Sequence, residues 1–159
     1  MDQYRIRPIE TGDAGQVLTL QRAAFVQEAL IYGDADMPAL TQPLEALESE
    51  LKDNLGCVAV AGDRIVGAAR ARAAGELLLV GRIAIAPDLQ GEGLGSALLE
   101  AVEERGREVG CRTAELFTGS FSQANIQLYE RLGYRESERV EQGEGVAEVY
   151  LRKQLHPGR

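Results

Sequence analysis

Residues 82–101 change character twice within twenty positions. The segment starts as an apolar, partly β-branched run that ends at Pro87, continues as a loop with three glycines, and then takes on the spacing of an amphipathic helix. Glycine lacks a Cβ atom, so such a loop can adopt backbone angles that other residues avoid and can point its N–H groups at one place. The sequence therefore predicts a strand, a tight turn and a helix, with the turn at the helix N-terminus.

A helix N-terminus of this kind favours an anion, above all phosphate or pyrophosphate, because its first N–H groups and the positive end of the helix dipole face the ligand. The P-loop is excluded, since it requires a lysine and none occurs in residues 91–96. The dinucleotide fingerprint Gly-x-Gly-x-x-Gly/Ala is excluded because neither glycine register supplies its third position. The loop is predicted to bind a phosphorylated ligand through another pattern, and an ordinary glycine-rich turn is the alternative.

Length and charge limit the class of protein. A chain of 159 residues fits one domain with a sizeable core. Its 17 Lys and Arg against 25 Asp and Glu give a net charge of −8, which argues against nucleic acid as a partner and favours cationic ligands. Cys57 and Cys111 are isolated, so we expect free thiols and no metal site. Without an N-terminal signal or a membrane-length apolar run, we expect a cytoplasmic protein that binds no membrane.

Residues 26–53 carry most of the acidity, with seven Asp and Glu against one Lys. Leucines spaced along one face predict a helix in the second half of this segment, which leaves its glutamates on a solvated face. Tyr32, Asp34 and Asp36 belong instead to a predicted loop, off any helical period. These three residues are candidates for binding a cationic substrate, and a merely solvated acidic surface is the alternative.

The remaining pattern predicts seven strands and four helices. Two strand-like runs flank the two-residue turn Gly62-Asp63 and predict a hairpin. The long apolar run that follows predicts a central strand, in which Gly81 indicates a bulge. The expected strands are 4–9, 57–61, 64–70, 77–86, 113–118, 134–140 and 146–152, and the expected helices are 13–25, 44–51, 94–109 and 122–133.

A second motif lies on the last of these helices, where residues 125–134 read Asn-Ile-Gln-Leu-Tyr-Glu-Arg-Leu-Gly-Tyr. Asn125 and Tyr129 stand at i and i+4, so both side chains project from one face of the helix. Taken alone, the segment also fits a capped amphipathic helix in which Tyr129 is a half-buried anchor.

The loop Gln-Gly-Glu-Gly-Leu-Gly at 90–95 resembles the acyl-coenzyme A loop of the GCN5-related N-acetyltransferases, the GNAT superfamily, and residues 125–134 resemble its other recurrent motif. The element order also matches, so the resemblance extends from Tyr4 to Leu155 and is weakest over residues 26–53. It implies an α/β (α+β) fold with a central, mixed, mostly antiparallel sheet of about seven strands flanked by four helices. It also implies a single domain over residues 1–159.

The resemblance carries roles to matching positions. The loop would bind the pyrophosphate of coenzyme A, the fourth strand would offer backbone groups to the pantetheine arm, and Asn125 would hydrogen-bond the arm or the adenylate end. Tyr129 would stand near the thioester sulfur as general acid. The implied loop residues are Gln90, Gly91, Glu92, Gly93, Leu94, Gly95 and Ser96, and the strand residues are Ile83, Ala84 and Ile85.

One departure concerns the general base. Some members of the superfamily carry a glutamate on the fourth strand, and aligning on Gln90 puts Leu79 at that position. Glu76 and Glu115 are substitutes, although an ordinary surface or strand-end glutamate is the alternative for each. Ordered water is a further route for the proton of the amine.

The resemblance implies an enzyme that transfers acetyl from acetyl-CoA to a primary amine, a small molecule or a peptide or protein amine, by direct attack in a ternary complex. Acetyl-CoA and the amine are then its partners, and no metal is needed. The alternative is a GNAT-fold module that binds or senses acyl-CoA without turnover. The closing hairpin offers an edge at which two copies could pair as a homodimer.

Overall fold

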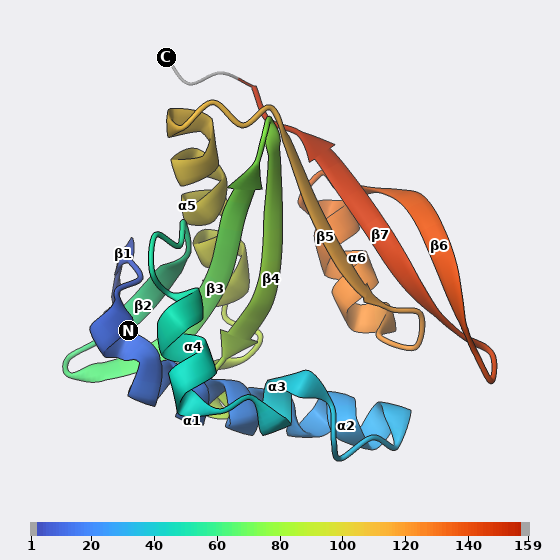
Figure 1. Cartoon of the computed structure of the whole chain (residues 1–159), viewed down its shortest axis with the longest axis horizontal. Helices are drawn as coiled ribbons and strands as arrows, with labels where there is room; N and C mark the ends of the chain where they lie inside the picture. The colour runs from blue at the N-terminus through green and yellow to red at the C-terminus, as the bar shows by residue number, and fades with distance from the viewer. Residues whose placement is uncertain (1–2, 157–159) are drawn as a thin grey trace.

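The computed structural model describes residues 3–156, so the ends of the predicted 1–159 domain lie outside the described residues. One seven-stranded sheet runs in the order β1-β2-β3-β4-β5-β7-β6 (Figure 1). Only the β4–β5 pair is parallel, which confirms the predicted mixed, mostly antiparallel sheet. The strands are β1 (Arg5–Pro8), β2 (Cys57–Ala61), β3 (Arg64–Ala74), β4 (Leu77–Ile85), β5 (Thr113–Gly119), β6 (Arg135–Gly143) and β7 (Val146–Gln154).

The described chain has six α-helices where four were predicted. The two additional helices are α2 and α3, which flank the predicted loop in the first half of the acidic segment, where no helix was predicted. Tyr32, predicted to lie in that loop, is the last residue of α2. Helix α2 follows α1 after a break at Phe25 and has no buried residue, so its sequence shows no apolar period. The helices are α1 (Ala14–Ala24), α2 (Val26–Tyr32), α3 (Pro38–Thr41), α4 (Leu44–Glu50), α5 (Leu94–Glu108) and α6 (Gln123–Arg131).

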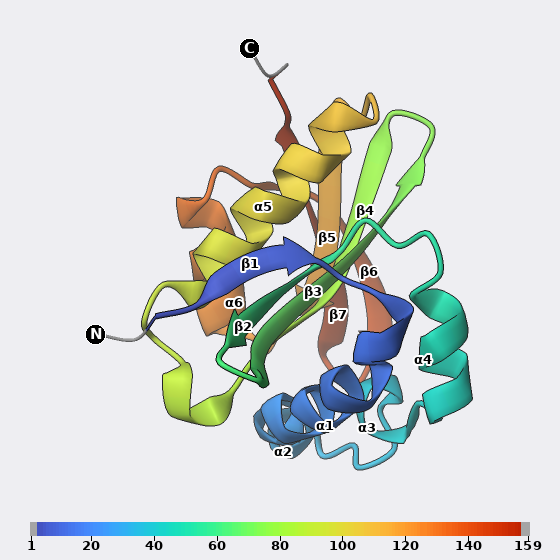
Figure 2. The ribbon, with the colours of Figure 1, turned by 90° about the vertical axis from the view of Figure 1, so that its left-hand side faces the viewer.

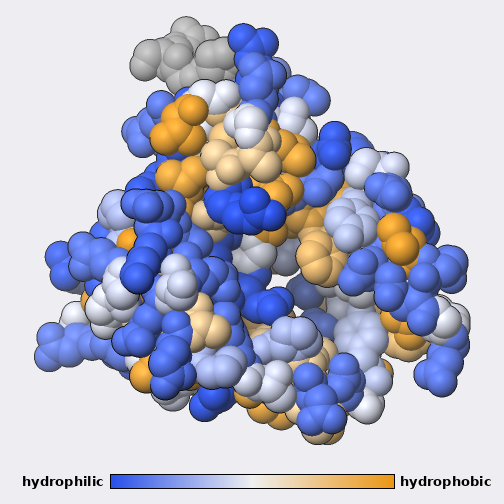
Figure 3. Space-filling model, viewed as in Figure 1, coloured by the Kyte–Doolittle hydropathy of each residue, from blue (hydrophilic) through white to orange (hydrophobic). Residues whose placement is uncertain are grey.

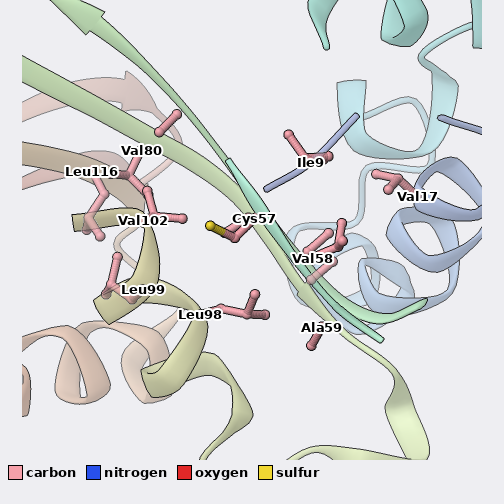
Figure 4. Close-up of a cluster of buried hydrophobic side chains, with 14 of the residues drawn as sticks. Ile9, Val17, Cys57, Val58, Ala59, Val80, Leu98, Leu99, Val102 and Leu116 are labelled. Atoms are coloured by element: carbon pink, nitrogen blue, oxygen red, sulfur yellow. The ribbon is translucent and has the colours of Figure 1, made fainter. Parts of the chain in front are cut away.

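Helices cover both faces of the sheet. In Figure 1, α5 and α6 lie behind the sheet and α4 lies in front, and the turned view in Figure 2 separates the same two layers. Successive side chains of β2 point into opposite layers. Val58 faces Val17 of α1, while Cys57 and Ala59 face the side of α5 (Figure 4). The β2 strand is therefore buried on both faces, as a central strand of two hydrophobic layers should be.

A buried arginine ties the front helices to the sheet. Arg70 on β3 is only 3% exposed, and it ion-pairs with Glu50 of α4. It also donates to the Oε1 atoms of Gln21, at 2.7 Å, and Gln42, at 3.3 Å. Because a buried cation must be fully paired, these contacts hold α1 and α4 at one position on the sheet. By fixing α1, the contacts of Arg70 also fix the point from which α2 starts.

The centre of the sheet opens. The parallel strands β4 and β5 pair only at Leu77–Leu79 with Thr113–Glu115, and beyond this they diverge (Figure 1). Against β3, the pairing of β4 shifts between Ala68 and Arg70, so that Arg82 and Ile83 together stand opposite one residue. This is a β-bulge, and it lies directly after Gly81, the residue that indicated one in the sequence.

Candidate active site

Two grooves meet at the opening between β4 and β5. The first, of about 370 Å³, runs from the glycine loop along the outer half of β4 to α6, and we call it the glycine-loop groove. The second, of about 570 Å³, is bordered by the α2–α3 segment, β5 and the β6–β7 turn, and we call it the hairpin groove. Figure 3 shows the surface hollowed in the middle of this face. Five residues line both grooves and form their junction: Phe25, Glu28, Ile83, Asn125 and Tyr129.

The glycine loop presents an uncapped helix N-terminus to the first groove. Gly91 and Gly93 have φ angles of 83° and 84°, a left-handed conformation that glycine adopts at no steric cost. Gly93 is the N-cap of the 15-residue helix α5, and no side chain caps it. The first N–H groups of α5 therefore remain available for an anion at the positive end of the helix.

Most of the predicted cofactor-binding residues line the glycine-loop groove. The exceptions are Glu92, which is exposed beside it, and Ala84, whose side chain is buried in the core. Leu94 lines the groove while its side chain also packs into the core. The residues that the structure brings together here are Ile83, Ile85, Gln90, Gly91, Gly93, Leu94, Gly95, Ser96 and Asn125.

Tyr129 lies at the junction, and Asn125 lies one turn before it on α6, as the spacing predicted. The Tyr129 side chain is 9% exposed, and its hydroxyl forms no hydrogen bond to any residue from 3 to 156. Burial, with a smaller contribution from the charge of Glu28, raises the pKa of Tyr129 to about 12. The phenol therefore stays protonated across the neutral range with its donor unused.

Glu28 on α2 is the carboxylate that the structure places at this junction. Its Oε2 accepts a hydrogen bond from Ser122 Oγ at 2.6 Å, and its Oε1 accepts one from Asn125 Nδ2 at 3.1 Å. The hydroxyl of Tyr32 in turn lies 2.7 Å from Ser122 Oγ. The carboxylate is thus held in one orientation by two groups at the start of α6, one of which also contacts Tyr32 of α2.

Sequence reasoning counted Glu28 only as part of the acidic segment. Its position depends on α2, which lacks the apolar period that predicts a helix. The sequence does place Glu28 and Tyr32 at i and i+4. That spacing predicts that the two side chains share one face only if residues 26–32 are helical.

The predicted substitutes for the base lie elsewhere. Glu76 pairs with Arg112 at 3.5 Å near the closed end of the β4–β5 gap, and Glu115 pairs with Arg152 at 2.8 Å. Neither glutamate lines either groove, and Leu79, which stands opposite Glu115, does not line them either.

Two of the three predicted substrate residues line the hairpin groove, and the third lies outside it. Tyr32 and Asp34 line the groove, whereas Asp36 is exposed outside it and donates its backbone N–H to Asp34 Oδ1 at 3.0 Å. Gly119 makes room for Tyr32, because a Cβ atom there would lie 2.1 Å from the Tyr32 hydroxyl oxygen.

Comparison with known families assigns the sequence to one of them. A sequence model described as the Acetyltransferase (GNAT) family matches residues 18–134. The chain belongs to this family. The predicted family is confirmed, and acetyl transfer is the general kind of chemistry that it implies.

Solved GNAT structures show the same fold over nearly the whole chain. Ribosomal-protein-S18-alanine N-acetyltransferase from Escherichia coli superposes with a TM-score of 0.81 at 19% identity, over 99% of this chain and 97% of that one. PaiA N-acetyltransferase from Thermoplasma acidophilum, solved with coenzyme A, gives 0.79 at 16% identity, over 96% and 99%. YncA from Salmonella typhimurium, a putative acetyltransferase solved with acetyl-CoA, gives 0.77 at 16% identity, over 99% and 97%.

A curated relative matches in sequence over a shorter stretch. An uncharacterized N-acetyltransferase of Methanocaldococcus jannaschii is 35% identical over 65 residues, which cover 41% of this chain. The match spans 29% of the length of that relative. Within residues 3–156, no helix combines the length and the apolar character needed to cross a bilayer, and no cluster of acidic, Cys and His side chains is arranged to hold a metal ion.

The coupling between Glu28 and Tyr129 is testable by titration. Glu28→Gln removes the negative charge that opposes ionisation of the phenol, so the pKa of Tyr129 should fall below its value of about 12. It should stay above 10, because burial remains the larger cause. The measurement is the pH dependence of the NMR signal of tyrosine labelled at Cζ. Glu130→Gln, on an exposed neighbour in α6, is the control. Equal titration of Tyr129 in both variants would show that Glu28 does not act on it.

Proposed function

We propose that this protein transfers acetyl from acetyl-CoA to a primary amine by direct attack of the amine on the thioester. The observation that carries the proposal is the meeting of two grooves at one buried tyrosine and one oriented carboxylate. The glycine-loop groove would take the cofactor, and the hairpin groove would take the amine. Transfer then happens at Tyr129 and Glu28 without any covalent enzyme intermediate.

The cofactor groove suits coenzyme A in its chemistry. The uncapped N-terminus of α5 with its two left-handed glycines is proposed to bind the pyrophosphate. Beyond Leu79 the edge of β4 no longer pairs with β5, so its backbone groups are available to the amide-rich pantetheine arm in the manner of an added strand. Ile83 and Ile85 would contact the arm, and Asn125 would hydrogen-bond it through its amide oxygen.

Glu28 is proposed as the proton acceptor. An amine that arrives as an ammonium ion must lose one proton before attack and a second after the C–N bond has formed. Ser122 and Asn125 already hydrogen-bond Glu28, so its carboxylate is oriented toward the junction without further ordering. Tyr32 and Asp34 would hold the amine within the hairpin groove, with Asp36 orienting Asp34 through its backbone N–H.

Tyr129 is proposed to stabilise the leaving group. As the C–S bond breaks, negative charge builds on sulfur, and the free phenol donor can hydrogen-bond it. A full proton transfer from a phenol of pKa about 12 to an alkyl thiolate is uphill, since a thiol such as cysteine has a pKa of only about 8.5. The hydrogen bond is therefore the main contribution of Tyr129, and the departed thiolate takes its proton from solvent.

A charge placed in the loop tests the cofactor site. Gly93→Glu puts a side chain and a negative charge where the pyrophosphate is proposed to bind, so acetyl-CoA affinity by calorimetry and thiol release over a panel of amines should both be lost. Gly110→Glu is the matched control, because Gly110 has a similar φ of 94°, lies past the opposite end of α5 and has open space around its Cβ position. Equal affinity in the two variants would remove the loop from the cofactor site.

Removal of the phenol donor tests the chemistry. Tyr129→Phe keeps the buried ring, so acetyl-CoA affinity should survive. The loss of one donor to a developing charge is typically worth about 10²- to 10³-fold, and kcat should fall by that factor where chemistry limits turnover. Single-turnover kinetics on the best amine of the panel measures it. An unchanged single-turnover rate would make Tyr129 a packing residue only.

A wild-type protein that binds acetyl-CoA but releases no thiol with any amine would point to a sensing module instead.

A further inference from the structure

Arg82 on β4 is a partly buried cation without a protein partner. Its Nε atom is buried and has no hydrogen-bond partner, and across residues 3–156 its guanidinium makes neither a hydrogen bond nor an ion pair. A desolvated guanidinium donor that is left unpaired is costly, so proteins rarely keep one without a use for it. The side chain lines the hairpin groove and is absent from the lining of the glycine-loop groove.

The backbone at Arg82 is also unusual. Its φ angle is +51°, in the left-handed region that side-chain-bearing residues seldom adopt. The residue forms the β-bulge opposite β3, at the place where β4 has already parted from β5. Bulges of this kind redirect a side chain, and strained backbone persists where the surrounding structure holds it, often at functional sites.

Two carboxylates near Arg82 are already paired with other arginines. Besides the hairpin groove, Arg82 borders a neighbouring hollow that contains Glu50 and Glu115. Glu50 is paired with the buried Arg70, and Glu115 is paired with Arg152 at 2.8 Å. Neither of these two carboxylates pairs with Arg82, whose guanidinium lines the hairpin groove without an ion-pair partner among residues 3–156.

We propose that the acceptor is a primary amine that also carries a carboxylate, and that Arg82 binds this carboxylate in the hairpin groove. The inference rests on the proposed function and names the substrate class of the same site. A guanidinium presents a fork of N–H donors that fits the two oxygens of a carboxylate. The amino end of the same molecule would then reach the junction, which Glu28 and Tyr129 line together with Ile83, the residue after Arg82.

The charges of the groove fit such a dipolar ligand. Carboxylates from α2, the α2–α3 segment and the hairpin line the same groove and favour an ammonium group: Glu28, Asp34, Glu144 and Glu148. Arg82 supplies the one opposite charge among the residues that line it. A phosphate would also fit a guanidinium, but its second negative charge would meet these acids, so a carboxylate is favoured. The acceptor expected from the net charge, a cation, is thus refined to an ammonium group that also carries a carboxylate.

Binding to the protein saturated with coenzyme A tests the proposal without turnover. The probes are α-amino acids and ω-amino acids of increasing chain length, each compared with its own carboxamide by calorimetry. The best carboxylate should bind about 10- to 100-fold more tightly than its carboxamide, as expected of hydrogen bonds to a charged group. Arg82→Gln should abolish this difference, and Arg82→Lys should retain part of it. All variants should keep wild-type affinity for coenzyme A, which shows that they are folded.

Arg72→Gln is the matched control, since it removes the same charge from an exposed residue of β3 that does not line the hairpin groove. Equal affinity for carboxylates and carboxamides, or a preference that survives in Arg82→Gln, would overturn the proposal. Tighter binding of O-phosphoethanolamine than of every carboxylate would overturn it in favour of a phosphate-bearing amine. No binding by any probe would also overturn it.

Thiol release from acetyl-CoA with the same probes separates this inference from the proposed function. Turnover of carboxamides and carboxylates alike would leave acetyl transfer standing and remove the role of Arg82. Arg82-dependent binding of carboxylates without thiol release from any amine would support the binding site and contradict acetyl transfer.

Discussion

Parallel pairing between β4 and β5 ends at Leu79 and Glu115, although both strands continue for several residues. Each strand keeps its outer partner, since β4 stays paired with β3 and β5 stays paired with β7. Two halves of one sheet thus separate at its centre, and each exposes an unpaired edge of backbone N–H and C=O groups. Such an edge is normally a liability, and here it supplies hydrogen-bonding groups to whatever ligand enters the gap.

The functional side chains at the gap come from elements that are distant in the sequence. Helix α2 brings Glu28, helix α6 brings Asn125 and Tyr129, and the bulge in β4 turns Arg82 toward the hairpin groove. The fixed position of α1, which the buried Arg70 network secures on the sheet, is what allows α2 to reach across to Ser122 and Asn125. Loss of that network would therefore disturb the junction without any change in the residues that line it.

The sequence predicted those parts of the fold whose cause is local. Gly91 and Gly93 are required by left-handed backbone angles at a helix start. Strands such as β2 run apolar, and strands such as β7 alternate, because the sheet buries both faces of the first and one face of the second. Glu28 and Arg82 escaped sequence reasoning because nothing local distinguishes them. The first depends on an exposed helix without an apolar face, and the second depends on a shift of register between two strands. Asp36 was grouped with Asp34 by proximity in sequence, yet the turn between them places only Asp34 in the groove.

Hydrogen exchange of the backbone amides, with and without coenzyme A, tests most directly whether the gap in the sheet is the cofactor site. If it is, coenzyme A should slow exchange in residues 91–96 and in the half of β4 beyond Leu79, where no pairing with β5 protects the strand. Exchange in β1 and β2, on the far side of β3, should stay the same. Unchanged exchange in residues 91–96 and in the outer half of β4 at saturating coenzyme A, with protection elsewhere or nowhere, would contradict the account.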